Sequence, residues 1–181
     1  MKVYYGCFHS VMVYGIVFWG HCAQANRIFL LQKRIVRIIN KEYFIAPCKP
    51  IFRNLKVLTL TSALILESAI LLRRKPEYFK SNQQVHGYNT RQSRNSHLPQ
   101  INSTLMKNSP YYNTIKIYNN IPEHIKCIQD QTKFKMKLKE YLMEKQYYNI
   151  KEYLENAWLK KKQQLTTVVR RTSSGLTSSI K

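Results

Sequence analysis

The chain has 181 residues, of which 30 are Lys or Arg and only 9 are Asp or Glu, so its formal net charge is +21. A hydrophobic content of 44% is enough for a packed core and excludes a wholly disordered chain. The charge predicts a polyanionic partner, with nucleic acid first and an anionic membrane surface second. Asp130 is the sole aspartate and the glutamates are isolated, so the sequence lacks the clustered carboxylates that hold Mg²⁺ in polymerases and nucleases.

The first predicted element is a buried helix over residues 2–19, an aromatic-rich run without charge after its first residue. The side chains expected on its inner stripe are Tyr4, Phe8, Val11 and Gly15. A secretory signal is an alternative, because residues 23–25 have the form of a cleavage site. His9, Ser10 and two glycines within the run argue against a signal. A transmembrane helix fits poorly, because the run is barely long enough and not uniformly apolar.

Residues 25–41 predict an amphipathic helix after a turn at residues 20–24. The apolar side chains expected to face the interior are Ile28, Leu31, Ile35, Ile38 and Ile39. The candidate phosphate-binding cations on the opposite face are Lys33, Arg34, Arg37 and Lys41. No acid in this stretch neutralises them, so the helix can follow a nucleic-acid backbone through positions one turn apart. The alternative is an ordinary core helix with a solvated basic face.

Two helices are expected next. Pro50 suits the first turn of a short helix over residues 51–56. A strongly apolar helix follows over residues 62–74, with Thr61 or Ser62 as its cap and Pro76 as its stop. Residues 81–104 are rich in polar side chains and predict a long surface loop.

The C-terminal part predicts more helices. Ser109 opens a helix that runs to residue 119, and residues 122–125 give one further turn. Thr132 is the expected cap of a helix over residues 133–145, although Phe134, Met136 and Leu138 alternate with lysines as in a strand. Helix-forming residues and the longer period favour the helix. A last helix is expected over residues 150–162.

The sum is an all-α fold. It comprises a helical bundle over residues 1–80, a polar loop over 81–108, a helical segment over 109–162 and a disordered basic tail over 163–181. The four cysteines make no C-x-x-C spacing, which favours an intracellular chain with reduced thiols. Scattered glycines exclude a phosphate-binding loop, and no serine lies in G-x-S-x-G. We therefore expect no catalytic residues, no cofactor and no small-molecule substrate for this chain alone.

The polar loop supplies further candidates for nucleic-acid contact. The side chains with suitable hydrogen-bonding or charged groups are Asn89, Thr90, Arg91 and Arg94. Tyr88 either stacks on a base or holds the loop in place, and the residues alone leave both roles open.

Several short motifs follow one another along the chain. They are Tyr14-Gly15-Ile16 with Trp19-Gly20, LQKRIVRII at 31–39, PIF at 50–52, LTL at 58–60, HGYNTR at 86–91, YNNIP at 118–122, residues 134–142 and YYNI at 147–150. In this order and spacing they resemble the C-terminal end of the reverse transcriptase of jockey-type non-LTR retrotransposons. The resemblance covers about residues 2–155, and the motifs Y-N-T-R and Y-N-x-[IL]-P are its most specific parts.

The resemblance implies that the chain corresponds to the thumb, which holds the template–product duplex, and to the segment after it. Lys33, Arg34 and Arg37 would then lie on or near the surface that faces the duplex. The palm, with its Mg²⁺-binding Asp pair, would lie upstream of Met1 and be a partner of this region. The full protein would be an RNA-directed DNA polymerase in the nucleus and cytoplasm. Without its palm, the first helix should leave an apolar patch exposed.

Two other readings of the sequence stay open. One is a non-enzymatic basic module that binds nucleic acid or another partner. The other is a secreted basic protein whose residues 1–25 are its signal peptide.

Overall fold

The computed structural model describes residues 1–86, 93, 95–156 and 158–159. Within these ranges the regular structure is helical, which confirms the all-α prediction, and the one strand-like pairing is an isolated bridge between Ser81 and Ser96. The elements are η1 (Tyr4–His9), α1 (Ser10–Val13), α2 (Ile16–Trp19), α3 (Ala25–Ile39), α4 (Cys48–Asn54), α5 (Leu60–Arg74), η2 (Pro76–Tyr78), α6 (Asn82–His86), α7 (Thr104–Lys107), α8 (Pro110–Asn119), α9 (Glu123–Lys126) and α10 (Gln131–Lys145). Residues 150–156 form a further helical segment.

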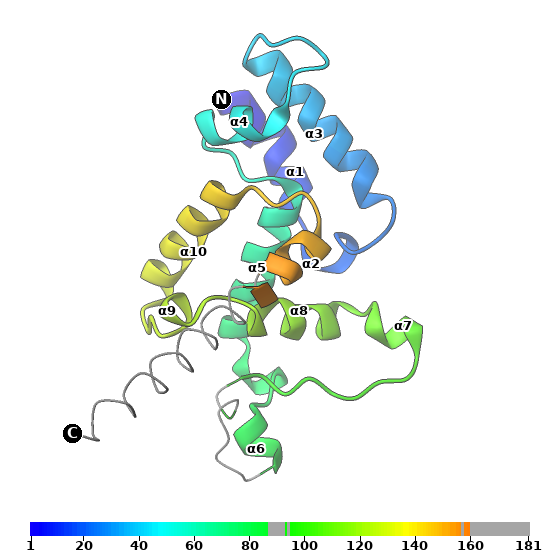
Figure 1. Ribbon diagram of the computed structural model, residues 1–181, viewed down its shortest axis with the longest axis vertical. Helices are drawn as coiled ribbons and strands as arrows, with labels where there is room; N and C mark the ends of the chain where they lie inside the picture. Colours follow the sequence, from blue (N-terminus) through cyan, green and yellow to red (C-terminus); the bar gives the residue numbers. More distant parts are fainter. Residues whose placement is uncertain (87–92, 94, 157, 160–181) are drawn as a thin grey trace, which may run out of the picture.

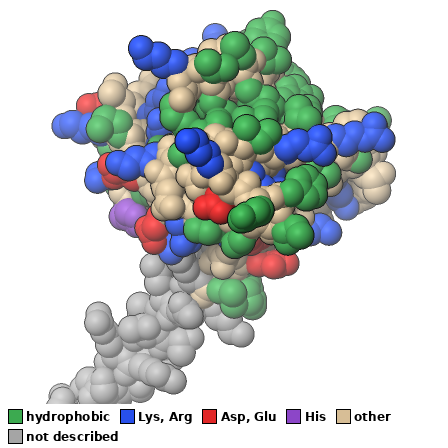
Figure 2. All heavy atoms as spheres, turned by 90° about the horizontal axis from the view of Figure 1, so that it is seen from above, with side chains coloured by type: hydrophobic (Ala, Val, Ile, Leu, Met, Phe, Trp, Pro, Cys, Tyr) green, Lys and Arg blue, Asp and Glu red, His purple; other side chains and the backbone are tan. Residues whose placement is uncertain are grey.

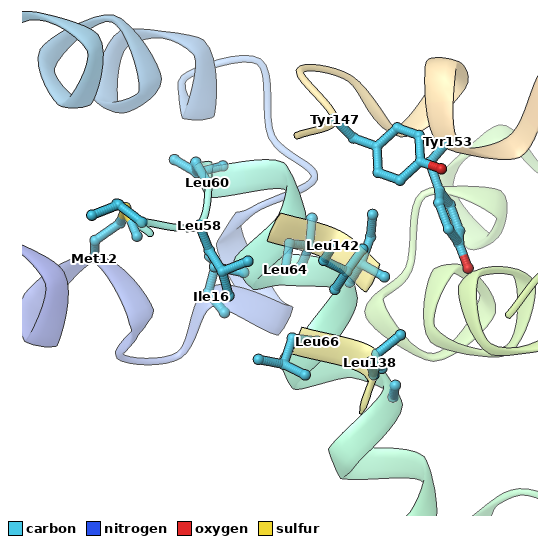
Figure 3. Packing of buried hydrophobic residues seen from close by; sticks show 14 of the residues in the cluster. Met12, Ile16, Leu58, Leu60, Leu64, Leu66, Leu138, Leu142, Tyr147 and Tyr153 are labelled. Carbon is cyan, nitrogen blue, oxygen red and sulfur yellow. The ribbon is translucent and has the colours of Figure 1, made fainter. Parts of the chain in front are cut away.

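Helix α5 is the centre of the fold, and α1, α2, α3, α8 and α10 contact it (Figure 1). Between residues 60 and 70 every side chain except Glu67 is buried. A helix that is apolar on all sides is stable only where other elements enclose it. Figure 3 shows the leucines that α5 and α10 bring together, which are Leu64, Leu66, Leu138 and Leu142.

The hydrophobic core is continuous from Tyr4 near the N-terminus to Tyr153 in the last helical segment. The hydroxyl of Thr59 donates to the carbonyl of Tyr147 at 2.6 Å, which joins the segment after α10 to the start of α5. The Tyr153 hydroxyl donates to the carbonyl of Ile117 in α8 at 3.1 Å. Burial raises the pKa of both tyrosines, Tyr147 and Tyr153, above the ordinary value. Residues distant in sequence therefore share one core.

The N-terminal segment corrects the prediction of a single buried helix over residues 2–19. It begins as the π-helix η1, continues as α1, and breaks before α2 at Gly15, whose φ of 61° suits glycine. The break lets Met12 and Ile16 reach the core, where both are buried. Val11, which was predicted on the inner stripe, is 73% exposed, because the segment does not form one continuous helix. Three other apolar side chains also face solvent, which are Val3 (76% exposed), Tyr14 (85%) and Phe18 (72%).

Gly20 follows the last residue of α2, where the backbone leaves little room for a side chain. A Cβ atom on Gly20 would lie 2.6 Å from the carbonyl oxygen of Ile16, which also accepts the Gly20 N–H, and 3.1 Å from methyl groups of Leu64. We expect Gly20→Ala to lower the free energy of unfolding by about 1–3 kcal/mol, as overpacking does. Urea denaturation beside Gly6→Ala, where a Cβ meets nothing within 4 Å, measures the effect. Equal stabilities of the two variants would contradict the clash.

The starts of two helices illustrate local capping. Helix α5 begins earlier than predicted, because Thr59 and not Thr61 or Ser62 is the cap, and the Thr59 hydroxyl accepts the N–H of Ser62 at 3.1 Å. Helix α8 opens at Ser109 as predicted, and the Ser109 hydroxyl caps it by accepting the N–H of Tyr112 at 3.2 Å.

Helix α10 confirms the choice of a helix over a strand. Phe134, Leu138 and Leu142, four residues apart, are buried, whereas Met136 is 58% exposed. Thr132 is not its cap. Asp130 is, and its carboxylate accepts the N–H of Thr132 at 2.8 Å. The sole aspartate of the chain therefore has a structural role in the fold.

The predicted loop over residues 81–104 is more ordered than expected within its described part. It contains α6, and α7 begins at its end. The N–H of Ser81 donates to the side-chain carbonyl of Gln84 at 2.9 Å, a local bond that favours a turn of helix there. The predicted tail over 163–181, and the end of the helix predicted over 150–162, lie outside the described residues.

Candidate nucleic-acid interface

Helix α3, at the upper end of the molecule, carries three of the four predicted phosphate-binding cations, which are Lys33, Arg34 and Arg37 (Figure 1). Its buried side chains are Ala25, Phe29, Gln32 and Val36, which form one helical stripe. This stripe corrects the predicted inner face. Ile28, Ile35 and Ile39 are partly buried as expected, but Leu31 is 51% and Ile38 69% exposed.

The buried face of α3 differs from the predicted one because it includes a buried polar side chain, Gln32. Gln32 is 0% exposed and bonds to the chain that enters α5, donating to the carbonyl of Leu58 and accepting the N–H of Leu60, each at 2.9 Å. Its side-chain N–H also donates to the Tyr4 hydroxyl at 2.9 Å. The prediction from hydrophobic periodicity assumed that Gln32 faces solvent. It therefore assigned the interior to the adjacent stripe of isoleucines and leucine.

Lys33 is half-buried and lies over two aromatic rings. Its ammonium is 4.4 Å from the ring centres of both Phe29 and Tyr148. The Lys49 ammonium lies 5.0 Å from the same Tyr148 ring and pairs with Glu152 at 2.9 Å. Contacts of this kind stabilise a cation against aromatic faces and fix its position. Lys33 therefore has a structural role beside any role toward a ligand.

Tyr148 and Glu152 show the electrostatics of this cluster. Burial raises the pKa of Tyr148 to about 12. Burial also opposes the charge of Glu152, but hydrogen bonds from the Tyr148 N–H and from Lys49 outweigh it and lower the pKa of this carboxyl. Sequence reasoning missed the cluster, because its members meet only in the fold and no local motif joins them.

Arg37 and Arg34 share the ring of Phe44 in the loop after α3. The Arg37 side chain donates through Nε to the carbonyl of Ala46 at 3.0 Å, which holds this loop against the helix. The guanidinium carbons of Arg34 and Arg37 lie 5.9 Å and 5.8 Å from the Phe44 ring centre. Arg34 is exposed and Arg37 half-buried, so Arg34 is the freer of the two for a phosphate.

Lys41 lies just beyond the end of α3, which was predicted to include it. The helix ends at Ile39, and Lys41 adopts a left-handed conformation with φ of 55°. Its N–H donates to the carbonyl of Ile38 at 3.1 Å, a common helix ending. Its side chain is exposed. Arg27, which the sequence argument did not select, is a further exposed cation on α3.

The second predicted group, Asn89, Thr90, Arg91 and Arg94, lies outside the described residues, and so does Tyr88. The described edges of this segment are α6 and Ser96. Helix α6 lies near the lower end of the molecule, far from α3 (Figure 1). Ser96 bonds to the side chain of Asn119 at the end of α8.

Apolar side chains and cations share the upper face of the molecule. Seen from above, hydrophobic side chains cover a broad area, and Lys and Arg side chains surround parts of it (Figure 2). The loop after α3 contributes Tyr43 and Ile45, which are 88% and 90% exposed. Exposed apolar side chains are therefore present as expected, and they occur in this loop as well as in the N-terminal segment.

The described part of the chain contains no group of three or more His, Cys, Asp or Glu side chains placed to hold a metal ion. None of its helices has the length and apolar character needed to cross a membrane. The cysteines Cys7, Cys22, Cys48 and Cys127 are free thiols.

No protein-family description, curated protein sequence or solved structure matches this chain.

Proposed function

We propose that this chain is a nucleic-acid-binding helical unit, the thumb and following segment of a jockey-type non-LTR retrotransposon reverse transcriptase. The observation that carries the proposal is the ordered series of sequence motifs, above all Y-N-T-R at 88–91 and Y-N-N-I-P at 118–122. The net charge of +21 supports a polyanionic partner. RNA-directed DNA synthesis, and the Mg²⁺ it needs, would belong to the palm of the parent protein.

The candidate cations divide into two kinds under this proposal. Arg34 and Lys41 are exposed and would contact the phosphates of an RNA–DNA duplex. Lys33 and Arg37 would act mainly by holding the α3 surface in shape, because Phe29, Tyr148 and the loop after α3 already engage them. The exposed apolar side chains of the N-terminal segment offer a surface that the palm would cover.

We expect the double variant Arg34→Gln, Lys41→Gln to bind an RNA–DNA duplex more weakly and with a shallower salt dependence. Loss of two phosphate contacts should reduce the slope of log K against log salt concentration by about 2. Fluorescence anisotropy over a salt series measures this slope. The matched control is Lys133→Gln, Lys135→Gln, which removes two exposed charges from α10. An unchanged slope in the α3 variant, or an equal fall in the control, would overturn the assignment of α3.

Charge reversal at Lys33 and Arg37 is a poorer test of binding. Lys33→Glu would place a carboxylate over aromatic faces, and Arg37→Glu would break the bond to Ala46. Either change alters the fold as well as the charge, so a loss of affinity would have two causes.

The sequence has two other readings. A basic binding module without polymerase ancestry would share the α3 surface, and a transcript beginning at Met1 without palm-coding sequence upstream would favour it. A secreted protein cleaved after residue 25 would lose Tyr4, Met12 and Ile16 from the core, which disfavours this reading. Mass spectrometry of the N-terminus of the native protein distinguishes the cleaved chain.

A further inference from the structure

A polar cleft of about 340 Å³ lies where the turn before α3, the start of α5, helix α8 and the segment after α10 meet. Its polar lining includes four asparagines and two lysines, which are Asn26, Asn108, Asn113, Asn149, Lys116 and Lys151. We call it the asparagine cleft. Its volume is in the range of sites that bind small organic ligands.

The charge of the asparagine cleft is wholly positive. Lys116 and Lys151 are exposed, neither has an ion pair among the described residues, and no Asp or Glu lines the cleft. The nearest acid in sequence, Glu152, binds Lys49 and the N–H of Tyr148. The starts of two long helices, α3 at Ala25 and α5 at Leu60, also line the cleft, but their first N–H groups are already hydrogen-bonded within the protein. The positive charge of the cleft therefore comes from its two lysines.

The cleft also offers hydrogen-bonding groups that the described residues leave unused. His21 lines the cleft, and its Nε2 atom is buried without a hydrogen-bond partner in this part of the protein. Burial lowers the pKa of His21. Because its Nε2 atom is itself buried, the ring forms part of the cleft wall. Among the described residues the exposed side-chain amides of Asn26 and Asn108 have no partner. Asn113 donates to the Ser109 carbonyl at 3.2 Å, and the side-chain oxygen of Asn149 accepts the N–H of Lys151 at 3.1 Å.

We propose that the asparagine cleft binds a nucleoside monophosphate group. The lysines would hold the phosphate, and the asparagine amides would bond to the polar edges of the base or sugar. Carboxamides suit such edges because each carries both a donor and an acceptor. A free mononucleotide and the unpaired phosphorylated end of a strand share this chemistry. The site is separate from the α3 cations and does not require them.

The test titrates the full chain at about 0.15 M salt with inorganic phosphate, adenosine, adenosine 5′-monophosphate and a short single strand with or without a 5′-phosphate. ¹H–¹⁵N spectra report the asparagine side-chain amides directly. We expect the monophosphate to shift these signals and adenosine to bind at least about tenfold more weakly, since charge-assisted bonds to the phosphate would be absent. If the strand binds only when it carries a 5′-phosphate, and the free nucleotide competes with it, then the end of a strand is a ligand of this cleft.

Two double variants distinguish binding in the cleft from a general effect of positive charge. Lys116→Ala, Lys151→Ala should weaken monophosphate binding about tenfold or more, and Lys133→Ala, Lys135→Ala on α10 should leave it unchanged. All four lysines are exposed, so both variants should fold. The α3 variant Arg34→Gln, Lys41→Gln should keep monophosphate binding even if duplex binding fails, which distinguishes this proposal from the duplex-binding one. No binding, equal losses in the two lysine variants, or equal affinity for adenosine would overturn it.

Discussion

Gln32→Leu is expected to lower the free energy of unfolding by about 3–5 kcal/mol, because it leaves several buried polar groups without partners. Gln32 bonds to the Tyr4 hydroxyl, the Leu58 carbonyl and the Leu60 N–H, each at 2.9 Å. A leucine of similar volume fills the space but satisfies none of these groups. The change therefore isolates the polar contribution from the packing contribution.

The size of this effect follows from what Gln32 joins. Its bonds connect η1, α3 and the chain that enters α5, so one side chain fixes three segments of the core. Burial raises the pKa of Tyr4 to about 12, with the Gln32 hydrogen bond acting in the opposite direction. A buried neutral hydroxyl next to a lost partner is costly, so the N-terminal segment should loosen first.

Urea denaturation followed by circular dichroism measures the loss of stability in Gln32→Leu. Gln24→Leu is the matched control, since Gln24 precedes the same helix, is exposed and makes no capping bond. Hydrogen exchange at the Leu60 amide gives a second readout, because this N–H loses its acceptor. A loss no larger than that of the control, with Leu60 exchange unchanged, would contradict the role given to Gln32.

Arg73→Met is expected to lower the free energy of unfolding by about 2–4 kcal/mol, since charged hydrogen bonds and a cation–π contact are lost together. One guanidinium nitrogen of Arg73 donates to the carbonyls of Lys126 at 3.1 Å and Ile128 at 2.6 Å. The guanidinium carbon lies 3.9 Å from the ring centre of buried Phe134. Arg73 thus connects the end of α5 to the turn between α9 and α10.

The neighbouring arginine is the natural control for this change. Arg74→Met alters the same charge at the same helix end, but Arg74 is exposed, so we expect a change within about 0.5 kcal/mol. Thermal and urea denaturation of both variants compares them directly. Equal losses would mean that the shared positive charge near the helix end, and not the contacts of Arg73, stabilises this region.

The sequence arguments succeeded where local chemistry decides the structure. Periodicity and helix formers predicted α10 against a competing strand pattern, and Ser109 was identified as the cap of α8. They failed where two adjacent stripes of a helix are both plausible, as for Leu31 and Ile38 on α3. Helix periodicity predicts that a face is buried, but which of two stripes faces the core depends on the neighbours that pack there.

The sequence by itself determined the helical class, the strong positive charge and the presence of an apolar central helix, because these depend on composition and local periodicity. Only the tertiary structure decided which cations are free to meet a ligand. All four cations fit the same predicted basic face. Lys33 contacts Tyr148 and Arg37 bonds to Ala46, whereas Arg34 and Lys41 are exposed. Tertiary packing also formed the asparagine cleft, since its lining comes from four separate segments that no local pattern joins.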